Sequence, residues 1–211
     1  MGRRSFTLIL GHAQHGKDTF ADALAREYRK LAGEDFYAPS SSLFACERAV
    51  LPVLGPRYGY RSVAEAYADR HAHRSEWFDL ISEYNREDPT RLVRDMLDAG
   101  ARAYVGLRSW REYSACLRAG FMTHVVWVYR AGAPTEPESS FDVDFHDARD
   151  IARARGVEFE NALNITGRRE VLERDAALLA RQLHDFEQRD LGLSPIDKPV
   201  QDDAAPVDPS A

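Results

Sequence analysis

Residues 6–19 read Phe-Thr-Leu-Ile-Leu-Gly-His-Ala-Gln-His-Gly-Lys-Asp-Thr, and this stretch decides the expected fold. It opens with a short apolar run that ends at a glycine. Such a run is typical of a buried strand in a parallel sheet, so we expect a strand over residues 6–10. Apolar residues then recur at helical spacing until Gly33, which predicts a helix over residues 17–31. The segment between them is therefore expected to be a strand-to-helix loop.

That loop has the pattern Gly-x-x-x-x-Gly-Lys, from Gly11 to Lys17. In the context of a strand, a loop and a helix, the pattern predicts a phosphate-binding loop. Its glycines allow the backbone to wrap closely around phosphates, and successive N–H groups together with the helix N-terminus form a positive concavity. The residues expected to contact a bound nucleotide are Gly11, His12, Ala13, Gln14, His15, Gly16, Lys17, Asp18 and Thr19.

Lys17 is the expected catalytic cation of this loop. Lysine occurs only at positions 17, 30 and 198, and the other 25 of the 28 basic residues are Arg. A lysine at this position in an arginine-rich chain indicates that a compact point charge is required, one that reaches the β- and γ-phosphates. The usual pattern places Ser or Thr directly after the lysine, whereas here Asp18 precedes Thr19. We expect the Thr19 hydroxyl to bind Mg²⁺, with Asp18 as a second candidate ligand.

The rest of the chain alternates between apolar and amphipathic segments. We expect further extended segments at residues 36–38, 103–107, 124–129 and 160–165. Helices are expected at residues 109–119, 146–155 and 168–186. Residues 43–99 have a helical pattern broken by Pro52, Pro56 and Pro89, which predicts about four short helices. The alternation predicts an α/β fold with a mostly parallel sheet of about five strands, covered by helices on both faces.

Composition predicts one folded domain over residues 1–190 and a disordered acidic tail, rich in Pro and Asp, over residues 191–211. The net charge of -6 mildly repels nucleic acid and anionic membranes as a whole, although local basic clusters can still bind phosphate. No run approaches the roughly 18 apolar residues that would span a bilayer, so no membrane partner is expected. Two cysteines, Cys46 and Cys116, suit a reducing compartment, and we expect a cytoplasmic protein.

Gly16-Lys-Asp-Thr19, at the start of the expected helix, resembles the phosphate loop of bacteriophage deoxynucleoside monophosphate kinases and related P-loop small-molecule kinases. A weaker resemblance continues through residues 83–92 and through residues 104–109 with Glu112. It implies a P-loop kinase-like three-layer sandwich with a helical substrate cap at about residues 43–100. It also implies ATP and Mg²⁺ as cofactors and a nucleoside monophosphate as the phosphoryl acceptor. Where several relatives have Asp-x-Arg at a strand end, this chain has Gly106 and keeps Arg108.

Two arginines follow expected strands, Arg108 after residues 103–107 and Arg130 after residues 124–129. Ligands bind at the carboxyl edge of open parallel sheets, and phosphoryl transfer depends on neutralising the developing charge. Arg108 and Arg130 are therefore candidate catalytic residues. The alternative is that both are solvated charges at strand ends.

In nucleotide kinases the segment that corresponds to residues 43–100 is a substrate cap, in which arginines hold phosphate and aromatic rings stack on bases. The candidate substrate-binding residues are Arg61, Arg74, Trp77, Tyr84 and Arg91. The structural alternative is that Trp77 and Tyr84 belong to an apolar stripe at helical spacing, which more often forms core.

Two other functions fit the loop. Phages that hypermodify thymine use related kinases on 5-hydroxymethyluracil in DNA, so a DNA acceptor is the first alternative. A nucleotide-binding switch is the second, but a GTPase would have an Asn-Lys-x-Asp segment, and the last expected strand ends Asn164-Ile-Thr-Gly167. The sequence leaves the base, the acceptor and the number of subunits open, a homodimer included.

Overall fold

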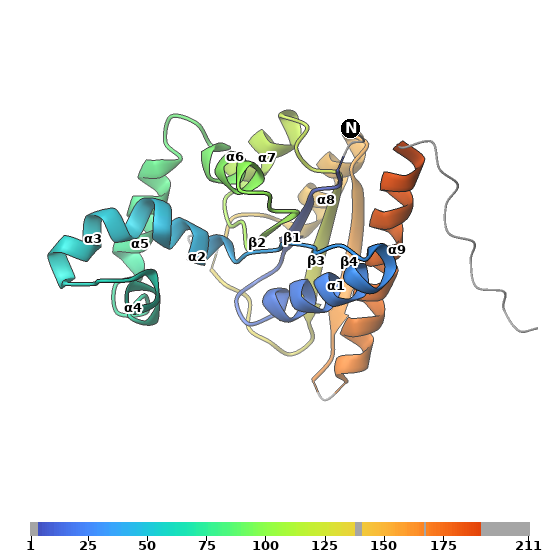
Figure 1. Cartoon of the computed structure of the whole chain (residues 1–211), viewed down its shortest axis with the longest axis horizontal. Coiled ribbons are helices and arrows are strands. Elements are labelled where there is room, and N and C mark those ends of the chain that lie inside the picture. The colour runs from blue at the N-terminus through green and yellow to red at the C-terminus, as the bar shows by residue number, and fades with distance from the viewer. Residues whose placement is uncertain (1–3, 138–140, 167, 191–211) are drawn as a thin grey trace, which may run out of the picture.

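The structure is a computed structural model that describes residues 4–137, 141–166 and 168–190 (Figure 1). Its centre is a sheet of four parallel strands in the order β2-β1-β3-β4. The strands are β1 (Thr7–Leu10), β2 (Ala103–Val105), β3 (His124–Arg130) and β4 (Glu158–Asn164). The expectation of an α/β protein with a parallel sheet is confirmed.

Helices pack on both faces of the sheet, an arrangement compatible with a three-layer sandwich. Successive strand residues point to opposite faces, so Ile9 and Val126 join one core cluster while Leu8 and Val125 join the other. The first cluster is covered by α1 (Lys17–Ala32) and α9 (Arg169–Asp190), which lie side by side in Figure 1. The second is covered by α6 (Arg91–Asp98), α7 (Trp110–Arg118) and α8 (Phe145–Ala154).

A helical lobe projects from one side of the sheet (Figure 1). It contains α2 (Ser41–Ala45), the π-helical turn η1 (Cys46–Val50), α3 (Leu51–Tyr58), α4 (Val63–Ala68) and α5 (Arg74–Tyr84). The lobe has a small core of its own, formed by Cys46, Val50, Leu54, Ala66 and Trp77. The expected cap over residues 43–100 thus divides into this lobe and α6, because Leu92, Val93 and Met96 of α6 pack into the main core.

Two of the three prolines expected to break this region lie within helix. Pro52 is the second residue of α3 and follows the π-helical turn, where the spacing of the helical hydrogen bonds changes. Pro56 lies in the last turn of α3 and removes a single helical hydrogen bond. Helical structure therefore runs without a break from Ser41 to Tyr58, and the prediction of a break at these two prolines is wrong.

The expected strand over residues 36–38 is not formed, so the described sheet has four strands rather than about five. The chain does run beside β2 here, because the Arg102 N–H donates to the Tyr37 carbonyl oxygen at 2.7 Å and Ser40 makes an isolated bridge to Val105. Pro39 lies between these two contacts and has no N–H to donate, which prevents a continuous ladder.

The expected acidic tail, residues 191–211, lies outside the described residues. Cys46 and Cys116 are free and buried. In the part of the chain that the structure describes, no helix is long and apolar enough to cross a membrane.

Candidate functional site

The loop between β1 and α1 lies at the carboxyl edge of the sheet, and two glycines give it its shape. Gly11 has a φ of 133°, and a Cβ there would stand 2.3 Å from the Val128 carbonyl oxygen of β3. Gly16 has a φ of 97° and caps α1, and a Cβ there would stand 2.3 Å from Asn164 Nδ2. At Gly11 the backbone of β3 leaves no room for a side chain, and at Gly16 the left-handed φ disfavours any residue other than glycine, which is the physical reason for the glycine spacing of the motif.

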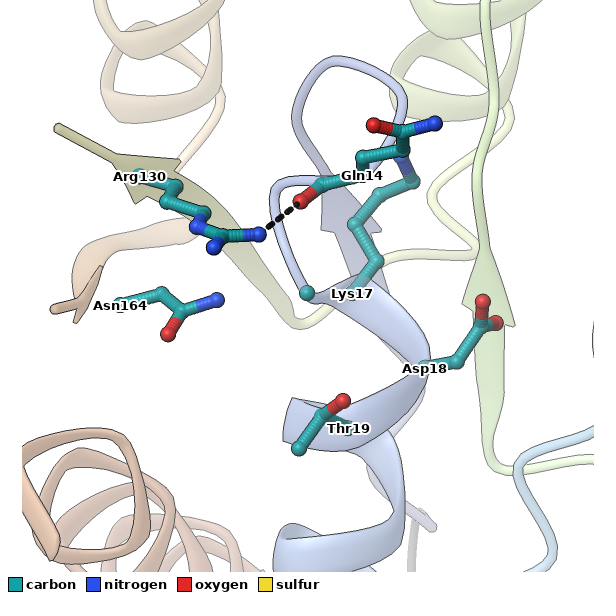
Figure 2. A pocket seen from close by; sticks show the side chains of 7 residues that line it. Gln14, Lys17, Asp18, Thr19, Arg130 and Asn164 are labelled. Atoms are coloured by element: carbon teal, nitrogen blue, oxygen red, sulfur yellow. Dashed lines mark hydrogen bonds between the residues drawn. The ribbon is translucent and has the colours of Figure 1, made fainter. Parts of the chain in front are cut away.

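A pocket of about 290 Å³ opens at the N-terminus of α1 (Figure 2). It is lined by Gln14, Gly16, Lys17, Asp18, Thr19, Arg130 and Asn164. The first amides of a helix have no acceptor within the helix and carry a partial positive charge. With Lys17 and Arg130 added, the pocket is suited to an anionic group such as a phosphate.

Lys17 folds back over the loop. Its Nζ donates to the carbonyl oxygens of Gly11 and His12, each at 2.7 Å. Burial and, second to it, the nearby positive charge of Arg108 lower the pKa of Lys17 to about 8. The charged lysine is therefore held at some cost in the free protein, and an anionic ligand would relieve that cost.

Arg130 and Asn164 hold the loop from the side of β3 and β4. Asn164 Nδ2 donates to the His15 carbonyl oxygen at 2.9 Å, and the Arg130 side chain donates to the Gln14 carbonyl oxygen at 3.4 Å (Figure 2). His15 is completely buried, and its Nδ1 accepts the backbone N–H of Arg130 at 3.4 Å. Sequence reasoning placed Arg130 here but missed Asn164, although its position at the end of a parallel strand was an available signal.

Arg108 meets a different partner, the carboxylate of Glu136, in the segment after β3. Glu136 Oε2 accepts the backbone N–H of Ala13 at 2.6 Å, and its Oε1 accepts a hydrogen bond from Arg74 at 3.1 Å as well as one from Arg108. Burial alone would raise the pKa of Glu136, but hydrogen bonds from Arg108 and Ala13 and the charge of Lys17 lower it overall. Glu136 is thus a charged carboxylate at the phosphate-loop motif, and no sequence pattern pointed to it.

The five candidate substrate residues do not converge on one place. Arg74 reaches the loop through Glu136, while Trp77 is 6% exposed and belongs to the core of the lobe, as the structural alternative expected. Tyr84 and Arg91 contact each other, with the guanidinium 4.0 Å from the ring centre, and the Tyr84 hydroxyl donates to Asp95. Arg61 is an exposed residue whose backbone N–H donates to Glu65 at the start of α4.

Thr19 and Asp18 both line the pocket and are the expected Mg²⁺ ligands. Gly106 follows β2, and a Cβ there would stand 3.6 Å from Lys17 Cε. Among the described residues, no group of three or more His, Cys, Asp and Glu could hold a metal. The donor set suits a Mg²⁺ ion that keeps several waters and phosphate oxygens and takes one or two ligands from the protein.

A scan against protein-family models, a search of curated proteins and a search of solved structures gave no match to this chain.

Proposed function

We propose that this chain is a P-loop kinase that transfers the γ-phosphoryl group of ATP to a deoxynucleoside monophosphate in a Mg²⁺-dependent reaction. The observation that carries the proposal is the pocket at the N-terminus of α1, where Lys17 and Thr19 follow a loop shaped by Gly11 and Gly16, both with positive φ. The parallel sheet supports it as well, because the pocket lies at the edge where ligands bind in such sheets. The finer fold assignment, a P-loop kinase-like sandwich, is part of the same proposal.

In this mechanism Lys17 exchanges its two bonds to loop carbonyl oxygens for bonds to the phosphates of ATP. The loop amides and Arg130 neutralise the charge that spreads over the phosphoryl oxygens as the bond to the leaving ADP breaks. Thr19 and Asp18 would hold Mg²⁺, which offsets the negative charge of the phosphates when it is bound. Arg108 and Arg74 lie beside the loop at Glu136, where they would orient a substrate phosphate.

The nature of the acceptor decides whether the enzyme needs a general base to remove a proton. A phosphate oxygen of a monophosphate is already ionised and attacks without losing a proton, whereas a hydroxyl group in DNA must give up its proton. Glu136 is the carboxylate next to the loop, but two arginines and an amide stabilise its charged form, which makes it a weak base. The geometry therefore favours a monophosphate acceptor over 5-hydroxymethyluracil in DNA.

The test is transfer from γ-labelled ATP to a panel of deoxynucleoside monophosphates, run beside an oligonucleotide that contains 5-hydroxymethyluracil. We expect label in a diphosphate, and a loss of about 10²–10³-fold in transfer for Lys17→Ala. The matched control is Lys30→Ala in the same helix, because Lys30 is exposed, pairs with Glu27 of α1 and does not line the pocket. Label in the oligonucleotide alone would move the acceptor to DNA, and full transfer by a folded Lys17→Ala protein would overturn the proposal.

A further inference from the structure

The Glu136 carboxylate is bound in the way that a protein binds a phosphate group. It accepts hydrogen bonds from the amide of Ala13 in the loop, from Arg108 after β2 and from Arg74 at the start of α5. The Glu136 side chain is 9% exposed, so these contacts largely replace its water. Three separate parts of the chain thus direct donors at one anionic group.

The donor set is typical of phosphate recognition. A loop amide combined with guanidinium groups forms short, charge-assisted hydrogen bonds with phosphate oxygens, and it forms the same bonds with a carboxylate. The matched case elsewhere in the protein is Glu173, whose Oε1 accepts bonds from Arg26 at 3.1 Å and from Arg169 at 2.9 Å. Glu173 is 40% exposed on the surface formed by α1 and α9, and its two arginine partners come from those helices rather than from the loop.

One carboxylate does not neutralise the positive charge gathered here. Arg74 and Arg108 both pair with Glu136, and the positive charge of Lys17 acts on it as well. A phosphate monoester carries close to two negative charges near neutral pH and offers three terminal oxygens. Such a group would satisfy the same donors and offset more of the positive charge than Glu136 does.

We propose that the Ala13 amide, Arg74 and Arg108 form a phosphate-binding site that Glu136 fills in the free protein, so that Glu136 competes with the phosphate group of the substrate. This inference rests on the proposed function for the identity of the ligand, a nucleotide phosphate. Glu136 is also tied to the loop through its backbone N–H, which donates to His12 Nδ1 at 3.1 Å. Displacement of the carboxylate by a phosphate would free the two arginines and the Ala13 amide, while this backbone bond does not involve the carboxylate.

The test compares the binding of pyrophosphate, ATP and deoxynucleoside monophosphates to the full chain by calorimetry. Glu136→Gln keeps the shape of the side chain but removes its charge, and we expect at least one probe to bind about tenfold more tightly. A gain for the monophosphates assigns the site to the acceptor, whereas a gain for pyrophosphate and ATP assigns it to the donor nucleotide. Glu173→Gln is the control and should bind every probe with wild-type affinity.

Two further variants keep the inference open to refutation. Glu136→Asp retains the negative charge, but its shorter side chain holds the carboxylate farther from the Ala13 amide and the two arginines. This variant should therefore bind the same probe more tightly than the wild type, by a smaller factor than Glu136→Gln. Adding Arg108→Ala to Glu136→Gln should remove the gain, because an arginine of the site is then missing. Affinities at or below the wild-type value for all probes, in both single variants, would overturn the inference.

This outcome is separable from the failure of the proposed function. Tighter binding by Glu136→Gln in a protein that transfers no label to any acceptor would keep the phosphate site and reject the kinase. Efficient transfer by the wild type with no gain in either Glu136 variant would keep the kinase and reject the competition.

Discussion

Two arginines bracket β2, and each pairs with a glutamate, at opposite edges of the sheet. Arg102 precedes the strand and pairs with Glu187, and these side chains are 5% and 14% exposed. Arg108 follows the strand and pairs with Glu136, and these side chains are 36% and 9% exposed. The two pairs have the same chemistry, so the difference between them lies in what surrounds each one.

The Arg102–Glu187 pair is surrounded by residues of the folded core. Glu187 also accepts the Ser5 N–H at 2.7 Å and the Ser5 hydroxyl at 2.6 Å, and the Arg102 guanidinium lies 4.4 Å from the centre of the Tyr28 ring. These contacts join the end of α9 to the chain just before β1. The partners of Glu136, in contrast, come from a loop and from the projecting lobe. We infer that the first pair stabilises the fold and that the second can be exchanged for a ligand.

Arg102→Ala should give the largest effect on stability. The substitution leaves Glu187 charged and mostly buried without its cation, and breaking a buried pair in this way costs about 3–5 kcal/mol. Urea denaturation should show this loss in the free energy of unfolding, while the protein that remains folded keeps its transfer activity. A loss below about 1 kcal/mol would show that the pair is not a structural element.

Arg108→Ala should reverse that pattern. Transfer should fall about 10²-fold because a cation that orients or neutralises phosphate is removed. The free energy of unfolding should change by less than about 1 kcal/mol. The reason is that the Arg108 side chain is 36% exposed and Glu136 keeps its bonds to Ala13 and Arg74. Arg118→Ala, an exposed arginine at the end of α7, serves as the control. Unchanged transfer with a large loss of stability would place both arginines in the same structural class.

The sequence was informative where the fold depends on local pattern. The apolar run before Gly11 and the helical spacing after Gly16 predicted β1 and α1, and the structure has both with the loop between them. Arg130 was predicted at a strand end and does line the pocket, because the carboxyl ends of parallel strands share one edge. Only the strand over residues 36–38 failed among the sheet predictions, where Pro39 interrupts a pairing that the neighbouring residues begin.

Glu136 could not be predicted because its role depends on the path of an irregular segment. Residues 131–144 have no periodicity, and the contact with Ala13 joins positions 123 residues apart. Arg74 is linked to the loop through the same carboxylate. Asn164 is different, because it ends a predicted strand at the edge of the sheet where ligands bind. That position alone was enough to predict Asn164 as a residue of the site.

The smallest predicted effect uses pH to separate binding from stability at the carboxyl edge. The pKa of Lys17 is about 8 in the free protein, and bound phosphates would raise it. The affinity for ATP should therefore fall about tenfold between pH 7 and pH 9, because above its pKa Lys17 must take up a proton before it binds. The stability of the free protein should show the opposite trend and rise with pH, since a lysine whose pKa is lowered on folding adds stability as pH rises through that pKa.

Calorimetry measures the affinity for ATP across this pH range and urea denaturation measures the free energy of unfolding, with Lys17→Met as the reference that lacks the titrating group. Parallel pH profiles for the wild type and Lys17→Met would show that Lys17 does not titrate near pH 8 and that its charge is not coupled to ATP.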